Sequence, residues 1–323
     1  MSASRWALLI GALILAALLA VAIGTINVPL SAVWDALQGK TDTMPAMVVR
    51  SLRLPRVALA ILVGAGLGMS GAALQGTMRN PLAEPYLLGV SGGAAVGAVI
   101  ATTLKLSIAI LPIAAFVGAL AAVVAAFFVA RAAGSRGDPR VLLMAGVVVG
   151  AFANAAIMVM LANAESNTVR NALWWMMGSV ADATWMQVSL LLAYIVVGGA
   201  ALVLLGRQID ILGLGEDAAA ALGLDVDRAI RNVFVLSSLI AAATVAAAGL
   251  VGFVGLVVPH LVRSVGVRKH RPLIVGSALA GATLVVLADL LGRVLRPPAE
   301  LPLGAVTALI GVPFFLAKLR RLS

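Results

Sequence analysis

Ten apolar segments, most of them close to twenty residues long, occupy the greater part of this 323-residue chain. A helix rises 1.5 Å per residue, so about 20 apolar residues cross a hydrocarbon core of roughly 30 Å. The segments are 6–24, 57–74, 87–104, 108–130, 141–162, 186–206, 230–248, 250–266, 273–292 and 301–317. Because lipid offers no partner to a backbone polar group, each segment is predicted to be helical. The sequence therefore predicts a single all-α membrane domain over residues 1–323, with about ten transmembrane helices.

The composition agrees with this class, since 62% of the residues are hydrophobic and only 11% are charged. In a soluble protein the net charge of +10 would suggest nucleic acid as a partner. In a membrane protein Lys and Arg gather on cytoplasmic loops, so membrane lipid is predicted as the surroundings and no nucleic acid as a partner. Residues 6–24 resemble a signal peptide, but their 19 apolar residues exceed a signal core of roughly 7–15. They are predicted to be the first span.

The distribution of Lys and Arg decides between ten spans and nine. Nine spans would make 230–259 one helix of about 45 Å and would place the basic C-terminus outside. With ten spans and the N-terminus inside, 15 of the 23 basic residues face the cytoplasm and eight face outward. The positive-inside rule favours that arrangement. Both termini are therefore predicted to be cytoplasmic.

Glycines recur four residues apart within several of the predicted spans. The pairs and runs are Gly64/Gly68, Gly89/Gly93/Gly97 and Gly146/Gly150. Such spacing lets two helix backbones approach closely, either within the chain or across a dimer. Close packing inside the chain is the simpler of the two interpretations.

Charged residues return in one long stretch, 207–231, which the ten-span topology places in the cytoplasm. Its middle, 215–222, is rich in alanine and carries Glu216 and Asp217 at its start, which is typical of a short helix. Gly223 follows at a position suited to a helix C-cap. The stretch is either a solvated loop or a helix presented to a soluble partner.

The sequence contains few residues that could form a catalytic, cofactor-binding or metal site. Gly39–Thr41 reads GKT, yet a phosphate-binding loop needs glycine at position 34, which is Trp34. His260 and His270 lack a neighbouring carboxylate cluster, and the chain has no cysteine. No catalytic, cofactor or metal site is therefore predicted. Asp289, near an outer helix end beside Arg293, is the one candidate for an acid within a span, whereas an ion-coupled transporter normally buries such groups on its path.

Two loops with proline and glycine, 79–93 and 249–263, read RNPLAEPYLLGVSGG and GLVGFVGLVVPHLVR. With other motifs in order, they resemble the FecCD/BtuC-like family of bacterial ABC importer permeases. The other motifs are RLPR at 53–56, WWMMGS at 174–179, the loop 212–226, LAD at 287–289 and ELPLGAVTALIGVPFF at 300–315. The resemblance covers nearly the whole chain.

This resemblance implies a type II ABC importer permease fold in the bacterial cytoplasmic (inner) membrane. It implies a homodimer with two cytoplasmic ATPase subunits, which bind ATP and Mg²⁺, and a periplasmic or lipid-anchored substrate-binding protein outside. The cargo would be a metal chelate, with a ferric siderophore or haem favoured and cobalamin as the alternative. An ion-coupled secondary transporter is the rival function, and an integral membrane enzyme is disfavoured by the shortage of His, Cys and buried acids.

The resemblance also implies roles for individual residues. The ATPase-coupling residues would be Leu212, Gly213, Gly215, Glu216, Asp217, Ala220, Leu222 and Gly223. The residues that dock the binding protein would be Arg53, Arg56 and Arg293. The alternative is that these arginines contact lipid headgroups or pair with residues nearby. The cytoplasmic gate would include Asn80, Leu82, Asp138 and Pro139, although relatives can have small hydroxyl residues at the last two positions. Asn154, Met158 and Met160 would line either the pathway or a plain lipid or core face.

Overall fold

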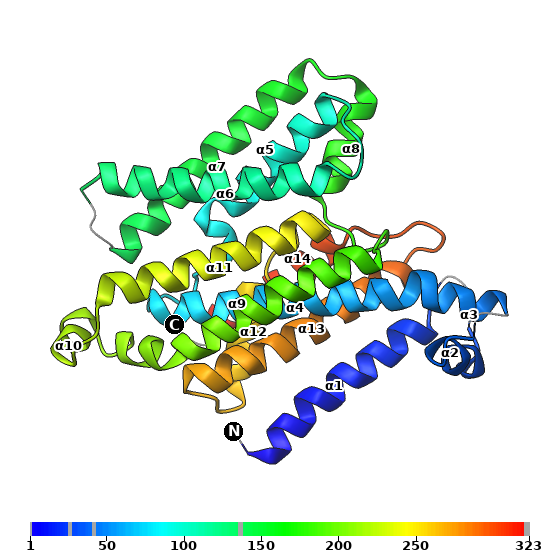
Figure 1. The fold of residues 1–323 in the computed structure, drawn as a ribbon, viewed down its shortest axis with the longest axis horizontal. Helices are drawn as coiled ribbons and strands as arrows, with labels where there is room; N and C mark the ends of the chain where they lie inside the picture. The colour runs from blue at the N-terminus through cyan, green and yellow to red at the C-terminus, as the bar shows by residue number, and fades with distance from the viewer. Residues whose placement is uncertain (1, 25–27, 41–42, 135–137, 320–323) are drawn as a thin grey trace.

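The computed structural model describes residues 2–24, 28–40, 43–134 and 138–319, and these fold into helices and connecting loops (Figure 1). Seven helices are long and apolar enough to cross a membrane. They are α1 (Ala3–Ala22), α4 (Leu54–Thr77), α6 (Leu111–Ala132), α7 (Pro139–Ala162), α9 (Trp185–Leu212), α11 (Val226–Ala248) and α13 (His270–Val294), α4 continuing a helical run that begins at Met44. Three shorter apolar helices are α5 (Val90–Thr103), α12 (Val254–Ser264) and α14 (Leu303–Leu319).

Each of the ten predicted spans coincides with one of these ten helices, and a break between α11 and α12 divides 230–266 into two helices, as predicted. Gly249 and Phe253 adopt positive φ angles of 68° and 67° at that break. The remaining helices lie at the ends of the spans or in their connections. They are α2 (Leu30–Leu37), α3 (Met44–Val48), α8 (Ser166–Met176), α10 (Glu216–Ala221), a π-helical turn η1 (Val49–Arg53) and a 3₁₀ turn η2 (Pro85–Leu88).

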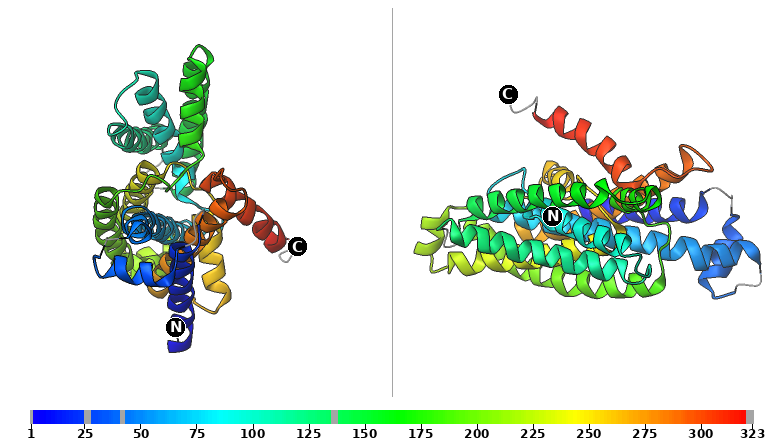
Figure 2. Two further views of the ribbon diagram at one scale, coloured as in Figure 1. Left: turned by 90° about the vertical axis from the view of Figure 1, so that its right-hand side faces the viewer. Right: turned by 90° about the horizontal axis from the view of Figure 1, so that it is seen from above.

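Helix α4 is the centre of the bundle, with nearly all of its residues buried. The end-on view shows it surrounded by the other helices (Figure 2). Its glycines make this possible, because a β-carbon on Gly64 would collide with the backbone of Gly281, and one on Gly71 with the backbone of Gly255. The glycine spacing noted in the sequence therefore serves packing within the chain, as in many membrane helix pairs.

Helices α5, α6, α7 and α8 form a second layer beside this bundle (Figure 1). Glycine again sets the distance between neighbours: Gly93 of α5 and Gly118 of α6 face each other so closely that neither could carry a side chain. Gly146 of α7 contacts the backbone of Leu87 and Leu88 in the same way. Phe127 of α6 packs edge-on against Phe234 of α11 at 4.9 Å and joins the two layers.

The three short helices leave non-helical backbone inside the protein, because 14, 11 and 17 residues extend only about 21, 16 and 26 Å. Buried backbone of this kind must be hydrogen-bonded. The Val251 amide donates to the Tyr86 hydroxyl at 2.9 Å. The Leu303 and Gly304 amides donate to the carbonyls of Gly178 and Met177 at 3.0 and 2.9 Å.

Gln75 of α4 supplies a hydrogen-bond donor that is missing within α12. Pro259 lies inside α12 and has no N–H, so the carbonyl of Gly255, four residues earlier, loses its helical donor. The Gln75 side-chain amide donates to the Gly255 and Leu256 carbonyls, both at 3.1 Å. Its own carbonyl accepts from Arg263 at 2.6 Å. A single buried amide thus fixes α12 against the central helix.

The glycine contacts predict opposite effects for one substitution at two sites. Gly64→Ala should destabilise the protein by about 1–3 kcal/mol, because the new methyl group meets the backbone of α13. Gly11→Ala is the control: it lies in α1 with no atom within 4 Å of an added β-carbon, and alanine favours a helix by up to about 1 kcal/mol. Thermal unfolding in detergent measures both. Equal melting temperatures for the two variants would contradict the close packing of α4 and α13.

Candidate functional site

The segment 213–224 contains the predicted short helix, α10, which begins at Glu216 and ends at Ala221. Gly215 precedes it with a φ of 112°, and Gly223 follows it with a φ of 82°, conformations that favour glycine. The amides of Gly223 and Leu224 donate to the carbonyls of Ala220 and Ala219 at 2.9 and 3.1 Å. This pair of bonds is a Schellman C-cap, so local sequence chemistry alone ends the helix.

Helix α10 lies beyond the ends of α9 and α11 (Figure 1), and several apolar side chains on it and beside it are exposed. Ala219 is its buried anchor, packed with Leu212, Ala229 and Ile230. Ala218, Ala220 and Ala221 are exposed, and Leu214 and Leu222 on either side are 66% and 64% exposed. Exposed leucines outside the membrane-spanning part of a chain indicate a protein contact.

Two polar contacts tie this end of the molecule to the core. Arg79, after α4, forms an exposed ion pair with Glu216 at 3.4 Å. Asp210, in the last turn of α9, accepts from the backbone amide of His270 at 3.0 Å and contacts its ring nitrogen Nδ1 at 2.7 Å. The carboxylate thereby caps the first turn of α13. Glu216 thus links α10 to the residue that follows the central helix, and Asp210 links α9, on which α10 packs, to α13.

The predicted gate residues Asn80 and Leu82 lie in the loop that follows α4. The Asn80 side chain accepts from the Leu82 amide at 2.9 Å, which makes an Asx turn. Leu82 is 46% exposed, and His260 of α12 contacts the Pro81 carbonyl at 3.1 Å. Burial raises the pKa of the nearby Glu84 carboxyl to about 7, so this loop carries a group that titrates close to neutral pH.

Asp138 and Pro139, the other two gate candidates, begin α7. The Asp138 side chain accepts from the Arg140 amide at 2.8 Å, and Pro139 occupies the first helical position. This is a standard helix start, with proline where no N–H is needed. Asp138 also lines a cavity formed with α6 and α11. The four gate candidates therefore lie on two segments, the loop after α4 and the start of α7, and neighbouring residues of both, Ala83 and Leu142, belong to one hydrophobic cluster.

The pathway candidates on α7 divide into two faces. Asn154 and Met158 are exposed, four residues apart on one side of the helix. Met160 instead packs against a small cluster of Ala95, Val99 and Ile157. An exposed asparagine halfway along a membrane helix is costly against lipid and normally faces protein or water. The Asn154 side of α7 is thus the side suited to a partner subunit or a polar path.

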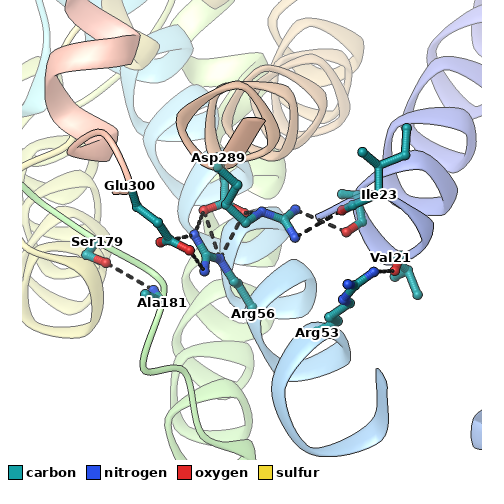
Figure 3. Close-up of polar contacts among 10 residues, drawn as sticks. Val21, Ile23, Arg53, Arg56, Ser179, Ala181, Asp289 and Glu300 are labelled. Atoms are coloured by element: carbon teal, nitrogen blue, oxygen red, sulfur yellow. Dashed lines mark hydrogen bonds and ion pairs between the residues drawn. The ribbon is translucent and has the colours of Figure 1, made fainter. Parts of the chain in front are cut away.

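At the opposite end of the bundle, Arg53 and Arg293 hold the end of α1. Figure 3 shows Arg53 pointing toward Val21. Arg53 donates to the carbonyls of Val21 and Ala22 at 2.7 and 2.9 Å, and Arg293 donates to that of Ala20 at 3.0 Å. These carbonyls lie in the last turn of α1, where no helical donor remains. Two guanidinium groups also complement the negative end of the helix dipole.

Arg56 binds two carboxylates at once (Figure 3). Its Nε and Nη2 donate to Asp289 at 2.8–3.1 Å, and its Nη1 and Nη2 donate to Glu300 at 3.0 and 2.8 Å. Asp289 also forms an ion pair with Arg293 at 3.2 Å. Bidentate guanidinium–carboxylate pairs of this type are the strong ones. The network joins α4, α13 and the segment before α14.

These three arginines are more buried than residues that dock a partner are expected to be. Arg53 is only 6% exposed and Arg293 only 4%, and both are committed to α1. The side chain of Arg56 is 13% exposed, whereas that of Glu300 is 36% exposed. Although Arg53 and Arg56 are three residues apart, Arg53 points to α1 and Arg56 to α13.

Comparison with known proteins places this geometry in context. The model of the FecCD transport family matches residues 12–321. A cobalamin import system permease protein of Halobacterium salinarum is 44% identical over 85% of this chain and 73% of its own length. A hemin transport system permease protein of Yersinia pestis is 38% identical over 94% of this chain and 91% of its own length. A Fe(3+) dicitrate transport system permease protein of Escherichia coli is 37% identical, over 95% of each.

Among solved structures, a metal-chelate type ABC transporter in an inward-facing conformation superposes with a TM-score of 0.85. It is 28% identical, and the match covers 98% of each chain. The ten-helix arrangement is thus shared over the full length.

The arginine network predicts unequal effects for its two acids. Asp289→Asn should destabilise the protein by about 3–5 kcal/mol, since it leaves buried Arg56 and Arg293 short of a counter-charge. Glu300→Gln should cost no more than about 1 kcal/mol, because that carboxylate is partly solvated. Thermal unfolding of the two variants provides the measurement. A larger loss for Glu300→Gln would mean that Asp289 is not the anchor of the network.

Proposed function

The chain belongs to the FecCD transport family, and we propose that it forms the membrane path along which an ATP-driven importer moves a metal chelate into the cell. It is a multi-pass permease subunit, and in this family the ATPase activity resides in separate subunits. The observation that carries this function is the family match over residues 12–321, which includes both loops and α10. The chain itself performs no bond chemistry.

The cargo class follows from relatives that import haem, ferric citrate and cobalamin. We favour a ferric siderophore or haem, with cobalamin as the alternative. The assembly contains two copies of this chain, two cytoplasmic ATPase subunits with ATP and Mg²⁺, and a substrate-binding protein on the outer face. The exposed Asn154 side of α7 supports contact with the second copy or with the path. Both termini are cytoplasmic in this arrangement, as the charge distribution favours.

The coupling surface consists of α10 with the exposed residues Leu214 and Leu222. It seats on an ATPase subunit through apolar contact and small side chains. When the ATPase subunits close, α10 displaces α9 and α13 through Asp210 and His270. It also reaches the gate loop through Glu216 and Arg79.

We propose that the binding protein docks on Arg56 after the Glu300 carboxylate has moved away from it. The exposed Glu300 carboxylate occupies the same guanidinium nitrogens that a carboxylate of a partner would take. Arg53 and Arg293 take part by holding α1 in position rather than by direct contact.

A reconstituted importer tests the function and its coupling surface together. Uptake into liposomes should require ATP, the ATPase subunits and the binding protein, and should continue after ion gradients are abolished. Ala220→Arg should reduce both uptake and co-purified ATPase about tenfold or more, because it places bulk and charge on the exposed face of α10. Ala133→Arg, at the exposed end of α6, is the matched control and should leave both unchanged.

Two results would contradict this proposal. Uptake that persists without ATPase subunits but stops with the ion gradient would identify a secondary transporter. Wild-type uptake and co-purification for Ala220→Arg would remove α10 from the coupling surface while leaving the importer function in place.

Docking is tested by association kinetics with the cognate binding protein at low and high salt. Glu300→Gln should speed association about two- to tenfold, because it removes a competing carboxylate and adds net positive charge. Arg56→Glu should slow association, and added salt should reduce the difference in association rate between each variant and the wild type. If Glu300→Gln and Arg56→Glu both associate at the wild-type rate, Arg56 is not a docking residue.

A further inference from the structure

A cavity of about 790 Å³ opens at the cytoplasmic ends of α6, α7 and α11. The ends of these helices lie on the same side of the molecule (Figure 1). Among the residues that the structure describes, the lining combines two arginines and two aspartates with a wall of aliphatic and aromatic side chains. The charged lining residues are Arg131, Arg231, Asp138 and Asp227.

The polar and apolar parts of the lining are separated along the helix axis. Arg131 lies in the last turn of α6, and Val124 lies seven residues earlier, about 10 Å deeper toward the middle of the membrane. Val124 and Phe128 are 52% and 69% exposed, while Leu142 and Ile230 are buried beneath them. A charged mouth above an exposed apolar wall matches the polarity of a phospholipid lying in the cytoplasmic leaflet.

The charges at the mouth are available for a ligand. Asp227 and Arg231 are four residues apart on one face of α11, and both are exposed. In the described part of the chain, neither Arg131 nor Arg231 forms an ion pair with a carboxylate. Asp138 already caps α7, so Asp227 is the acid that remains to face a cation.

We propose that this cavity binds a phosphatidylethanolamine molecule of the cytoplasmic leaflet. Its phosphate lies between Arg131 and Arg231, where guanidinium groups form charge-assisted hydrogen bonds with phosphate oxygens. Its primary ammonium donates to Asp227. One acyl chain lies along Val124 and Phe128. A purely anionic lipid would gain from the arginines but would meet the aspartate without a counter-charge, so the mixed lining favours a lipid with both charges.

Native mass spectrometry of the purified permease with its ATPase subunits tests the site. Phosphatidylethanolamine should bind about tenfold more tightly than phosphatidylcholine, which has no N–H donor, or phosphatidylglycerol, which has no amine. Asp227→Asn should abolish the preference over phosphatidylcholine without changing phosphatidylcholine affinity. The double variant Arg131→Gln with Arg231→Gln should weaken all three lipids about tenfold or more, since all share the phosphate.

Arg140→Gln is the control, because Arg140 is an exposed arginine at the start of α7 that does not line the cavity. It should bind all three lipids as the wild type does. Thermal unfolding of each variant separates loss of binding from loss of folding. Equal affinity for phosphatidylethanolamine and phosphatidylcholine, or an unchanged preference in Asp227→Asn, would overturn the proposal. Lipid binding by the permease alone that disappears in the complex would also overturn it and would assign the cavity to the ATPase.

Discussion

The structure depends on one constraint, that backbone polar groups inside a membrane protein must find hydrogen-bond partners within the protein. Seven of the described helices satisfy this by themselves, but α5, α12 and α14 are too short to do so. The chain places the irregular segments before these helices against α4 and against one another, where Tyr86, Gln75 and the carbonyls near Gly178 supply the missing partners. The glycines of α4 allow that approach, because they let neighbouring backbones come within contact of it. The central position of α4, its glycine content and the interrupted helices packed against it are therefore consequences of one requirement, the hydrogen bonding of buried backbone.

The outer arginines follow the same rule, extended to charge. A buried guanidinium costs least when its donors are hydrogen-bonded and its charge is balanced. Arg56 uses all three of its nitrogens on Asp289 and Glu300, whereas Arg53 and Arg293 bind the carbonyl end of α1. The end of the first helix is thus held by charges that belong to other helices. Only Glu300 in this network is substantially exposed, which makes it the one member that a partner can replace at small cost to the fold.

The sequence predicted the parts of this protein that local chemistry determines. Apolar length located all ten membrane helices, and the glycines around α10 located a helix of six residues. It could not locate the hydrogen-bond partners of Arg53 and Arg293, because a basic residue at a predicted outer end looks the same whether it faces water or binds the end of a distant helix. The signal available was the end of α1, which has no basic residue in its last turn. Likewise, Pro259 announces an unpaired carbonyl, but nothing in the sequence states that Gln75, 184 positions earlier, satisfies it.

The energies of the contacts decide how motion can pass from α10 to the gate. The Arg79–Glu216 pair is nearly half exposed on both sides and contributes at most about 1 kcal/mol, so it cannot force the gate loop to move by itself. The stronger connection runs through packed helices: Ala219 packs on Leu212, α9 packs on α4, and the partly exposed Asp210 caps α13. Helices α13 and α4 then touch backbone to backbone at Gly64 and Gly281, where no side chain can absorb a displacement. We therefore infer that a shift of α10 moves α9, α4 and α13 as a body, together with α12, which Gln75 holds to α4.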